Sequence, residues 1–338
     1  MKLLQFIDPQ DGQHLGLVEG DSVIDLGVGG IYEVYYEGGG DEVGLVAAVE
    51  QLREKAGNAR RLDLDQLLAS SDASSPHLTK PVSGPSDNPH ALKVWLAGVT
   101  HEVSAKLREI EAHQATGAAV NVYDQKYKEV SSGGRPELFS KGEPDAVRGH
   151  GQAVTRPADT ARLVPETELV SVYGLNKQGQ LERLGYTGGN DVTDNGIEAD
   201  NPLNLPQAKN WAGGCASLGP LLVTADEYDD GDVTVSCEIL RDGQRVGFKE
   251  GKTGRDNLNM PDSLLHLERH LFRRIPLEAR SLLAFYWGTP IVFAEADLSD
   301  GVQVGDVMRL EFSGGIGQLE NAVVALEETG QLAGLEGV

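Results

Sequence analysis

The sequence of 338 residues is poor in cysteine and in basic side chains. Its two cysteines, Cys215 and Cys237, cannot build a disulfide framework or a zinc site by themselves, which agrees with a reducing compartment. Lys and Arg number 29 against 52 Asp and Glu, so the formal net charge is −23. This charge disfavours nucleic acid and anionic membranes as partners, because a phosphate-binding surface needs a dense basic patch.

Long apolar runs are also lacking. No segment approaches the roughly 20 apolar residues that span a bilayer. The N-terminus, MKLLQFIDPQDG, turns polar too early for a signal peptide. We therefore expect a cytoplasmic protein without a membrane partner. Hydrophobic residues make up 40% and charged residues 24%, a globular composition that excludes global disorder.

The chain divides at a segment rich in Ser, Pro and Asp, residues 71–89, which has no apolar period and predicts a linker. We expect a small N-terminal α+β domain over residues 1–70 and a mainly β domain over 90–338. Apolar periodicity predicts the individual elements. Strands are expected over 3–7, 14–18, 22–26, 92–99, 168–173, 185–190, 221–224, 233–240, 244–249 and 307–312, and helices over two parts of 41–69, 102–116 and 260–274.

The most informative stretch is VPETELVSVY, in which Glu166 and Glu168 enter an apolar, β-branched run. Side chains two residues apart on a strand point to the same face, so both carboxylates should project together. Asp191 follows the strand-like LGYTGGN and is expected in a turn. Neighbouring buried carboxylates repel each other unless a cation neutralises them. Oxygen donors alone favour Mg²⁺, with Mn²⁺ or Ca²⁺ as alternatives, and the competing interpretation is a solvated strand face.

The neighbouring motifs favour the metal site. The chain resembles the fumarylacetoacetate hydrolase superfamily in five motifs that occur in the same order, namely Glu166-Thr167-Glu168, Gly185 to Asp191, Lys209, Leu218-Gly219-Pro220 and Gly288-Thr289-Pro290. The resemblance covers about residues 90–325. It implies that the α+β fold has a catalytic domain of that type. It also implies that Glu166, Glu168 and Asp191 bind the metal and that Lys209 lies beside the substrate.

The hydrolytic branch of this superfamily carries a His and Glu dyad that activates water. Those positions fall on Ser104 and Leu107, so the dyad is missing there, although His101 and Glu102 lie nearby. Other segments resemble the dehydratases that act on 2-keto-3-deoxy pentonates: WLAGVT (95–100), RPELFSK (135–141) and NPLNLPQAK (201–209). This resemblance implies a Mg²⁺-dependent hydro-lyase of pentose catabolism that gives 2,5-dioxopentanoate.

The resemblance also implies roles for individual side chains. Glu137 and Lys209 are expected to carry the proton transfers, and Lys141, Gly288 and Thr289 to bind the 2-oxo acid. Alternatives are hydrolysis of a carbon–carbon bond in an acylpyruvate, decarboxylation of oxaloacetate, and metal-dependent binding of a sugar acid without catalysis. The family resemblance also suggests a homodimer or a higher homo-oligomer.

Overall fold

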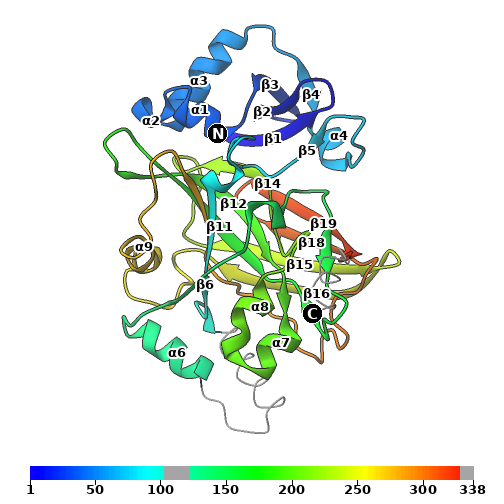
Figure 1. Cartoon of the computed structure of the whole chain (residues 1–338). Helices are drawn as coiled ribbons and strands as arrows, with labels where there is room; N and C mark the ends of the chain where they lie inside the picture. The colour runs from blue at the N-terminus through cyan, green and yellow to red at the C-terminus, as the bar shows by residue number, and fades with distance from the viewer. Residues whose placement is uncertain (103–121, 328–338) are drawn as a thin grey trace, which may run out of the picture.

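A computed structural model describes residues 1–102 and 122–327 of the chain (Figure 1). Two antiparallel-rich sheets, together with short helices, make up the fold. Apart from Glu102, the helix expected over 102–116 lies outside the described residues. No helix in the described ranges is long and apolar enough to cross a membrane.

The larger sheet has 12 strands within the described residues and runs through both parts of the chain. Its ten successive strands are β4 (Arg61–Asp63), β3 (Ser22–Val28), β2 (Gly12–Glu19), β1 (Lys2–Asp8), β14 (Ala216–Thr224), β12 (Leu181–Asp191), β11 (Thr167–Leu175), β17 (Leu282–Tyr286), β6 (Leu92–Gly98) and β7 (Glu137–Ser140). Two short strands join it from the side, β5 (His77–Leu78) on β1 and β8 (Val147–Arg148) on β14.

The smaller sheet packs against the middle of the larger one through β11, β12 and β14. Its strands are, in order, β16 (Gln244–Thr253), β15 (Val233–Arg241), β18 (Val307–Phe312), β19 (Gly317–Ala325) and β9 (Val154–Arg156). A further pair is formed by β10 (Leu163–Val164) and β13 (Thr193–Asp194). The α+β, mainly β prediction is therefore confirmed. The sequence patterns had missed β17 and β19, as well as the short strands β4, β5, β7, β8, β9, β10 and β13.

Short helices lie at both ends of the molecule (Figure 1). Around the N-terminal strands they are α1 (Ile31–Tyr36), α2 (Gly40–Val43), α3 (Leu45–Ala56) and α4 (Leu64–Ala69). The others are α6 (Val122–Ser131), α7 (Asn195–Asp200), α8 (Leu205–Lys209) and α9 (Leu264–Phe272), with 3-10 turns η1 (Pro89–Ala91), η2 (Pro144–Ala146) and η3 (Pro202–Asn204). The two helices expected within 41–69 correspond to α3 and α4.

The N-terminal strands extend the sheet that the strands after residue 90 form, because β1 pairs with β14. Within the expected linker, β5 pairs with β1, and Val82 is fully buried. These contacts hold the linker against the sheet. The domain division at 71–89 stays a prediction.

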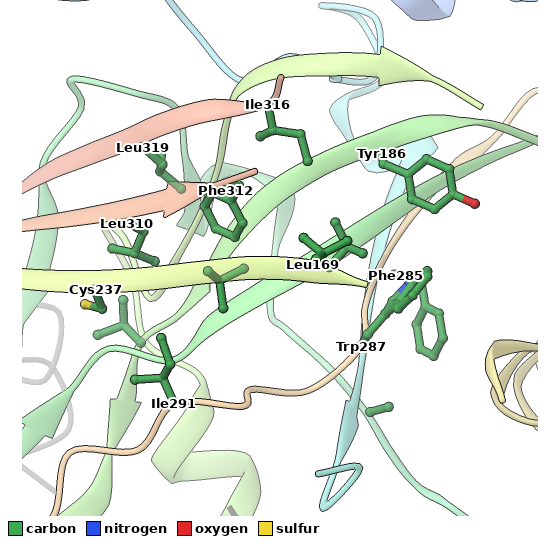
Figure 2. Packing of buried hydrophobic residues seen from close by; sticks show 14 of the residues in the cluster. Leu169, Tyr186, Cys237, Phe285, Trp287, Ile291, Leu310, Phe312, Ile316 and Leu319 are labelled. Atoms are coloured by element: carbon green, nitrogen blue, oxygen red, sulfur yellow. The ribbon is translucent and has the colours of Figure 1, made fainter. Parts of the chain in front are cut away.

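Alternation along the central strands gives the larger sheet two different faces. Leu169 of β11 and Phe312 of β18 lie in the apolar core between the two sheets, together with Leu310, Leu319 and Trp287 (Figure 2). Val170 and Val172 of β11 point the opposite way, into a second core beneath the N-terminal unit. Because side chains alternate along a strand, Glu168 shares the face of Val170 and Val172. The candidate site is therefore on the side of the larger sheet that faces away from the smaller sheet.

The two glycines before Asn190 are required by packing. A Cβ on Gly188 would overlap the ring of Phe312, and one on Gly189 would overlap the ring of Tyr286 and lie 2.6 Å from Val170 Cγ2. The GGND motif therefore lets β12 pass closely between the two rings, which lie on opposite faces of the sheet.

Replacing Gly189 by Ala should lower the free energy of unfolding by about 1–3 kcal/mol, because the added methyl group overfills a packed core. Urea denaturation of the purified protein measures this change. Gly231→Ala is the control, since a Cβ there meets the carboxylate ends of Asp229 and Asp256 at 3.2 Å. Equal stability of G189A and wild type would contradict the packing argument.

A candidate metal-binding active site

Three buried carboxylates meet at the adjoining ends of β11 and β12. Glu166 and Glu168 stand on either side of Thr167 where β11 begins, and Asp191 is the last residue of β12. Their ligand oxygens all lie within 4.8 Å of one another. The expectation that Glu166 and Glu168 project together is confirmed. The expectation that Asp191 sits in a turn is wrong, because strand pairing continues through it.

Backbone pairing explains this convergence. The Asp191 N–H donates to the Glu166 carbonyl at 2.9 Å, so the two residues face each other across the strand pair. The side-chain amide oxygen of Asn190 accepts from the Glu166 N–H at 3.1 Å. Residues directly opposite each other on paired strands share a face. The hairpin register therefore brings Asp191 to the two glutamates.

Two buried lysines surround the carboxylates. The Lys209 ammonium, at the end of α8, lies 3.0 Å from Glu166 Oε2, 2.7 Å from Asp191 Oδ2 and 2.7 Å from Thr193 Oγ1. The Lys141 ammonium pairs with Asp191 Oδ1 and donates to the Val192 carbonyl at 2.7 Å. Both side chains are almost fully buried. Asp191 therefore lies between two cations.

The environment separates the acidities of the carboxyl groups. Burial raises the pKa of Glu168 well above its usual value, and the charge of Asp191 raises it further, against the opposing effect of Lys209 and the Gly288 N–H. Burial also works to raise the pKa of Asp191, but attraction by Lys141 and Lys209 outweighs it and lowers that pKa. The two lysines thus favour the charged form of Asp191, while Glu168 is left with excess negative charge around it.

A hard divalent cation fits this donor set. The three clustered carboxylates share the cavity with Glu137 and Glu198, and Lys141 and Lys209 place their ammonium groups on Asp191. Carboxylate oxygens are the preferred ligands of Mg²⁺, Mn²⁺ and Ca²⁺. An added cation would also favour ionised Glu168. The site can hold a metal, and the assignment of its ligands stays a prediction.

A cavity opens beside the carboxylates between β6, β7 and α7. Its further lining residues are Ala97, Gly98, Val99, Glu137, Phe139, Glu198, Leu205, Lys209, Gly288 and Thr289. Glu137, the first residue of β7, pairs with Gly98 of β6. A Cβ on Gly98 would collide with the Glu137 carboxylate, so glycine makes room for that group. Val99 has a φ of 56°, a strained conformation of the kind that clusters at active sites.

Most of the residues expected from the sequence reach this cavity. Glu137, Lys209, Gly288 and Thr289 line it, whereas Lys141 lies behind Asp191 and contacts that carboxylate. The Thr289 hydroxyl donates to the Ile291 carbonyl at 2.8 Å and accepts from the Ile291 N–H at 3.0 Å. It therefore shapes its own loop.

Sequence reasoning missed Glu198, a buried carboxylate that α7 carries into the cavity wall. The Asp194 carboxylate, which accepts from the Ile197 N–H at 3.2 Å, caps that helix. In a chain with 52 acidic residues, nothing local distinguished Glu198 from the others. Its position between Asp191 and Lys209 in the sequence was the one available signal.

The described part of the cavity contains no histidine that could replace the one in the hydrolytic dyad. Ser104 and Leu107, the positions where the dyad was sought, lie outside the described residues. His101 does not line the cavity; its ring is bonded to Thr100 and Thr253. Among the described lining residues, none is a histidine. The groups that can exchange protons there are carboxyl groups and Lys209.

Comparisons with known proteins agree with this geometry. Residues 110–324 match the family model described as fumarylacetoacetate (FAA) hydrolase, C-terminal. The chain is 34% identical over 233 residues to 2-dehydro-3-deoxy-D-arabinonate dehydratase of Saccharolobus solfataricus, covering 68% of this chain and 70% of that one. It is 31% identical over 252 residues to a protein of Haloferax volcanii named probable 2-keto-3-deoxyxylonate dehydratase, covering 74% and 76%.

Solved structures show the same fold. A 2-keto-3-deoxy-D-arabinonate dehydratase complexed with magnesium and 2,5-dioxopentanoate superposes with a TM-score of 0.70 at 25% identity, covering 97% of this chain and 100% of that one. A hydrolase of the psychrophile Exiguobacterium antarcticum, at 23% identity, superposes with a TM-score of 0.62.

Proposed function

The chain belongs to the fumarylacetoacetate hydrolase family, and from that premise we propose that it is a Mg²⁺-dependent hydro-lyase. Its substrate is a 2-keto-3-deoxy sugar acid, a pentonate, and its product is 2,5-dioxopentanoate. The observation that carries the proposal is the buried carboxylate triad with Glu137 beside it, in a cavity whose described lining has no histidine. Two relatives named as dehydratases of such acids support it.

Glu166, Glu168 and Asp191 would hold the cation, and Mg²⁺ is the choice that the magnesium-bound neighbour supports. When bound, the cation supplies the positive charge that polarises the 2-oxo group and makes the C3 protons more acidic. Lys209 contributes a second positive charge to the cavity wall and keeps Glu166 and Asp191 turned inward. Mn²⁺ and Ca²⁺ are alternatives, because they take the same oxygen donors.

Glu137 acts as the general base and acid. Its carboxylate takes a proton from C3, the C4–O bond breaks, and the leaving hydroxyl receives a proton and departs as water. The 3-ene that forms is an isomer of 2,5-dioxopentanoate and reaches it when hydrogens shift from C5 and its hydroxyl to C3 and C4. Glu198 lies in the same cavity wall, within the space where these shifts occur.

The Gly288–Thr289 loop holds the substrate carboxylate in this proposal. Gly288 gives its N–H to Glu168 Oε2 at 2.7 Å, and Thr289 bonds to Ile291. These two bonds hold the loop in place beside Glu168, one of the carboxylates that would bind the metal. A chelating 2-oxo acid placed at the triad would have its carboxylate next to this loop. Lys141 would act on that substrate through Asp191.

Incubation with 2-keto-3-deoxyarabinonate, or with its xylonate epimer, and Mg²⁺ should give a product lighter by one water, detected by mass spectrometry. Addition of EDTA should abolish the reaction, because the triad then holds no cation. Release of pyruvate from an acylpyruvate or from oxaloacetate, each offered with Mg²⁺ in a parallel incubation, would instead indicate acylpyruvate hydrolysis or oxaloacetate decarboxylation. Ligand recovered unchanged, with thermal stabilisation by ligand plus Mg²⁺, would indicate a non-catalytic binder.

The same proposal places the enzyme in the cytoplasm, in pentose catabolism, as a homodimer or higher homo-oligomer. Cys215 and Cys237 are both buried and unpaired with each other, as a reducing compartment favours. The exposed side chains of Val246 and Phe248 on the edge strand β16 offer apolar surface to a second copy.

A further inference from the structure

His101 lies outside the cavity, yet it is connected to the metal site by a chain of hydrogen bonds. Thr100 and His101 follow β6 and are both buried. Thr100 Oγ1 lies 2.7 Å from the Trp287 carbonyl oxygen and 2.9 Å from His101 Nδ1. On the other side of the ring, His101 Nε2 lies 3.2 Å from Thr253 Oγ1, at the end of β16.

The positions of the protons in this series of hydrogen bonds follow from which groups can donate and which can only accept. A carbonyl oxygen only accepts, so the single hydroxyl proton of Thr100 goes to Trp287. The Thr100 oxygen must then accept from His101, which requires a proton on Nδ1. Burial lowers the pKa of His101 to about 4, so the ring is neutral at pH 7 and Nε2 carries no proton. Thr253 therefore donates to Nε2.

The series of hydrogen bonds from His101 ends at the peptide group between Trp287 and Gly288. The Trp287 carbonyl and the Gly288 N–H belong to the same planar unit and point in opposite directions. Thr100 binds the carbonyl side, and Glu168 Oε2 accepts from the N–H side at 2.7 Å. Whatever turns the carbonyl also turns the N–H away from Glu168.

Other contacts hold Trp287 but do not set this rotation. Its N–H donates to the Leu169 carbonyl at 3.0 Å, and its indole N–H donates to Ser171 Oγ at 2.8 Å. The ring lies in the core beside Phe285 (Figure 2). At Gly288, with a φ of +87°, a Cβ would collide with the Thr100 hydroxyl. Thr100 is therefore packed directly against the peptide that it orients.

We propose that His101, protonated on Nδ1, is a positioning residue of the metal site: it fixes the Thr100 hydroxyl that orients the Trp287–Gly288 peptide toward Glu168. The inference rests on the metal site of the proposed function and deepens it. It also assigns a role to a histidine that lies close in the sequence to the positions where the dyad was sought. That histidine acts on a metal ligand through three residues and does not touch the substrate.

The first test is metal affinity, measured by titration calorimetry of the full-length protein with Mg²⁺ and with Mn²⁺. H101L removes both ring hydrogen bonds and should weaken binding about 10-fold or more, as loss of groups that orient ligands does. H101N keeps a donor near the Nδ1 position and should recover most of the affinity. H266L is the matched control, because His266 is also buried but bonds to the Gly134 carbonyl, away from the cavity.

The second test reads the tautomer in the wild-type protein without metal. Long-range ¹H–¹⁵N spectra of its imidazole rings should show the ring of His101, identified by the signal that H101N removes, protonated on Nδ1 and bare on Nε2 at pH 7. A proton on Nε2 would overturn the proposal, whether or not H101L folds. Metal affinity of H101L within about twofold of H266L would overturn it as well. If either result appears while the wild-type protein dehydrates the sugar acid, only the positioning role of His101 is rejected. If the wild-type protein shows no dehydratase activity, only the proposed function is rejected.

Discussion

Replacing Glu137 by Gln reduces turnover by a factor of about 10²–10⁴, the usual contribution of a positioned general acid or base, while binding of Mg²⁺ and of 2,5-dioxopentanoate is retained. The reason is geometric. Glu137 lines the cavity from β7 but lies outside the carboxylate triad. Glutamine keeps the shape of the side chain and one acceptor oxygen but cannot exchange a proton. Calorimetry measures binding, and the rate of water loss from the substrate measures turnover.

Glu143→Gln is the control for this variant. Glu143 follows β7 closely in the sequence but is exposed and pairs with His90 at 3.0 Å. Its replacement should leave both binding and turnover unchanged. If E137Q kept more than a tenth of wild-type turnover, the proton transfers would have to be assigned elsewhere in the cavity. Glu198→Gln would then be the variant to examine.

Replacing Glu168 by Gln weakens Mg²⁺ binding by about 10² or more, because removal of one charged partner from a buried charge pair costs about 3–5 kcal/mol. Turnover is lost with the metal. The amide oxygen can still accept from the Gly288 N–H, so the loop keeps its anchor. The loss can therefore be attributed to charge. Calorimetry with Mg²⁺ measures the change.

The same variant should behave differently without metal. The raised pKa of Glu168 means that its ionised form is disfavoured in the folded protein. A neutral amide removes that cost, so in EDTA the thermal unfolding midpoint of E168Q should equal or exceed that of wild type. Mg²⁺ should then raise the midpoint of wild type and of the exposed control Glu311→Gln, but not that of E168Q. A metal-induced shift retained in E168Q would remove Glu168 from the ligand set.

Short-range pattern was enough to predict the pairing of Glu166 and Glu168. The two-residue spacing of Glu166 and Glu168 on an apolar strand predicts that both point to one face, as they do. The GGND motif lies within 25 residues of them, and a simple hairpin joins β11 to β12. The long strands β6, β11, β12, β14, β15, β16 and β18 were also predictable, because apolar alternation is a local property of the chain.

The local sequence pattern was not sufficient to predict the conformation at Asp191. Glycine and asparagine before it are typical of a turn. Here the glycines admit the rings of Phe312 and Tyr286, and Asn190 binds the Glu166 backbone. These are contacts with strands 24 to more than 100 residues away. Strand pairing therefore continues to Asp191.

The amino-acid order alone predicted that Glu166 and Glu168 share one face and that such carboxylates suit a hard divalent cation. Strand order in space decided the rest. β17 lies between β11 and β6, which brings Gly288 to Glu168 and Thr100 to the Trp287 carbonyl across separations of 120 and 187 positions. The tertiary structure also brings Lys141 to Asp191 and Glu198 into the cavity wall, and it places His101 behind that wall. No local period encodes such encounters, because they depend on which strands become neighbours when the two cores close.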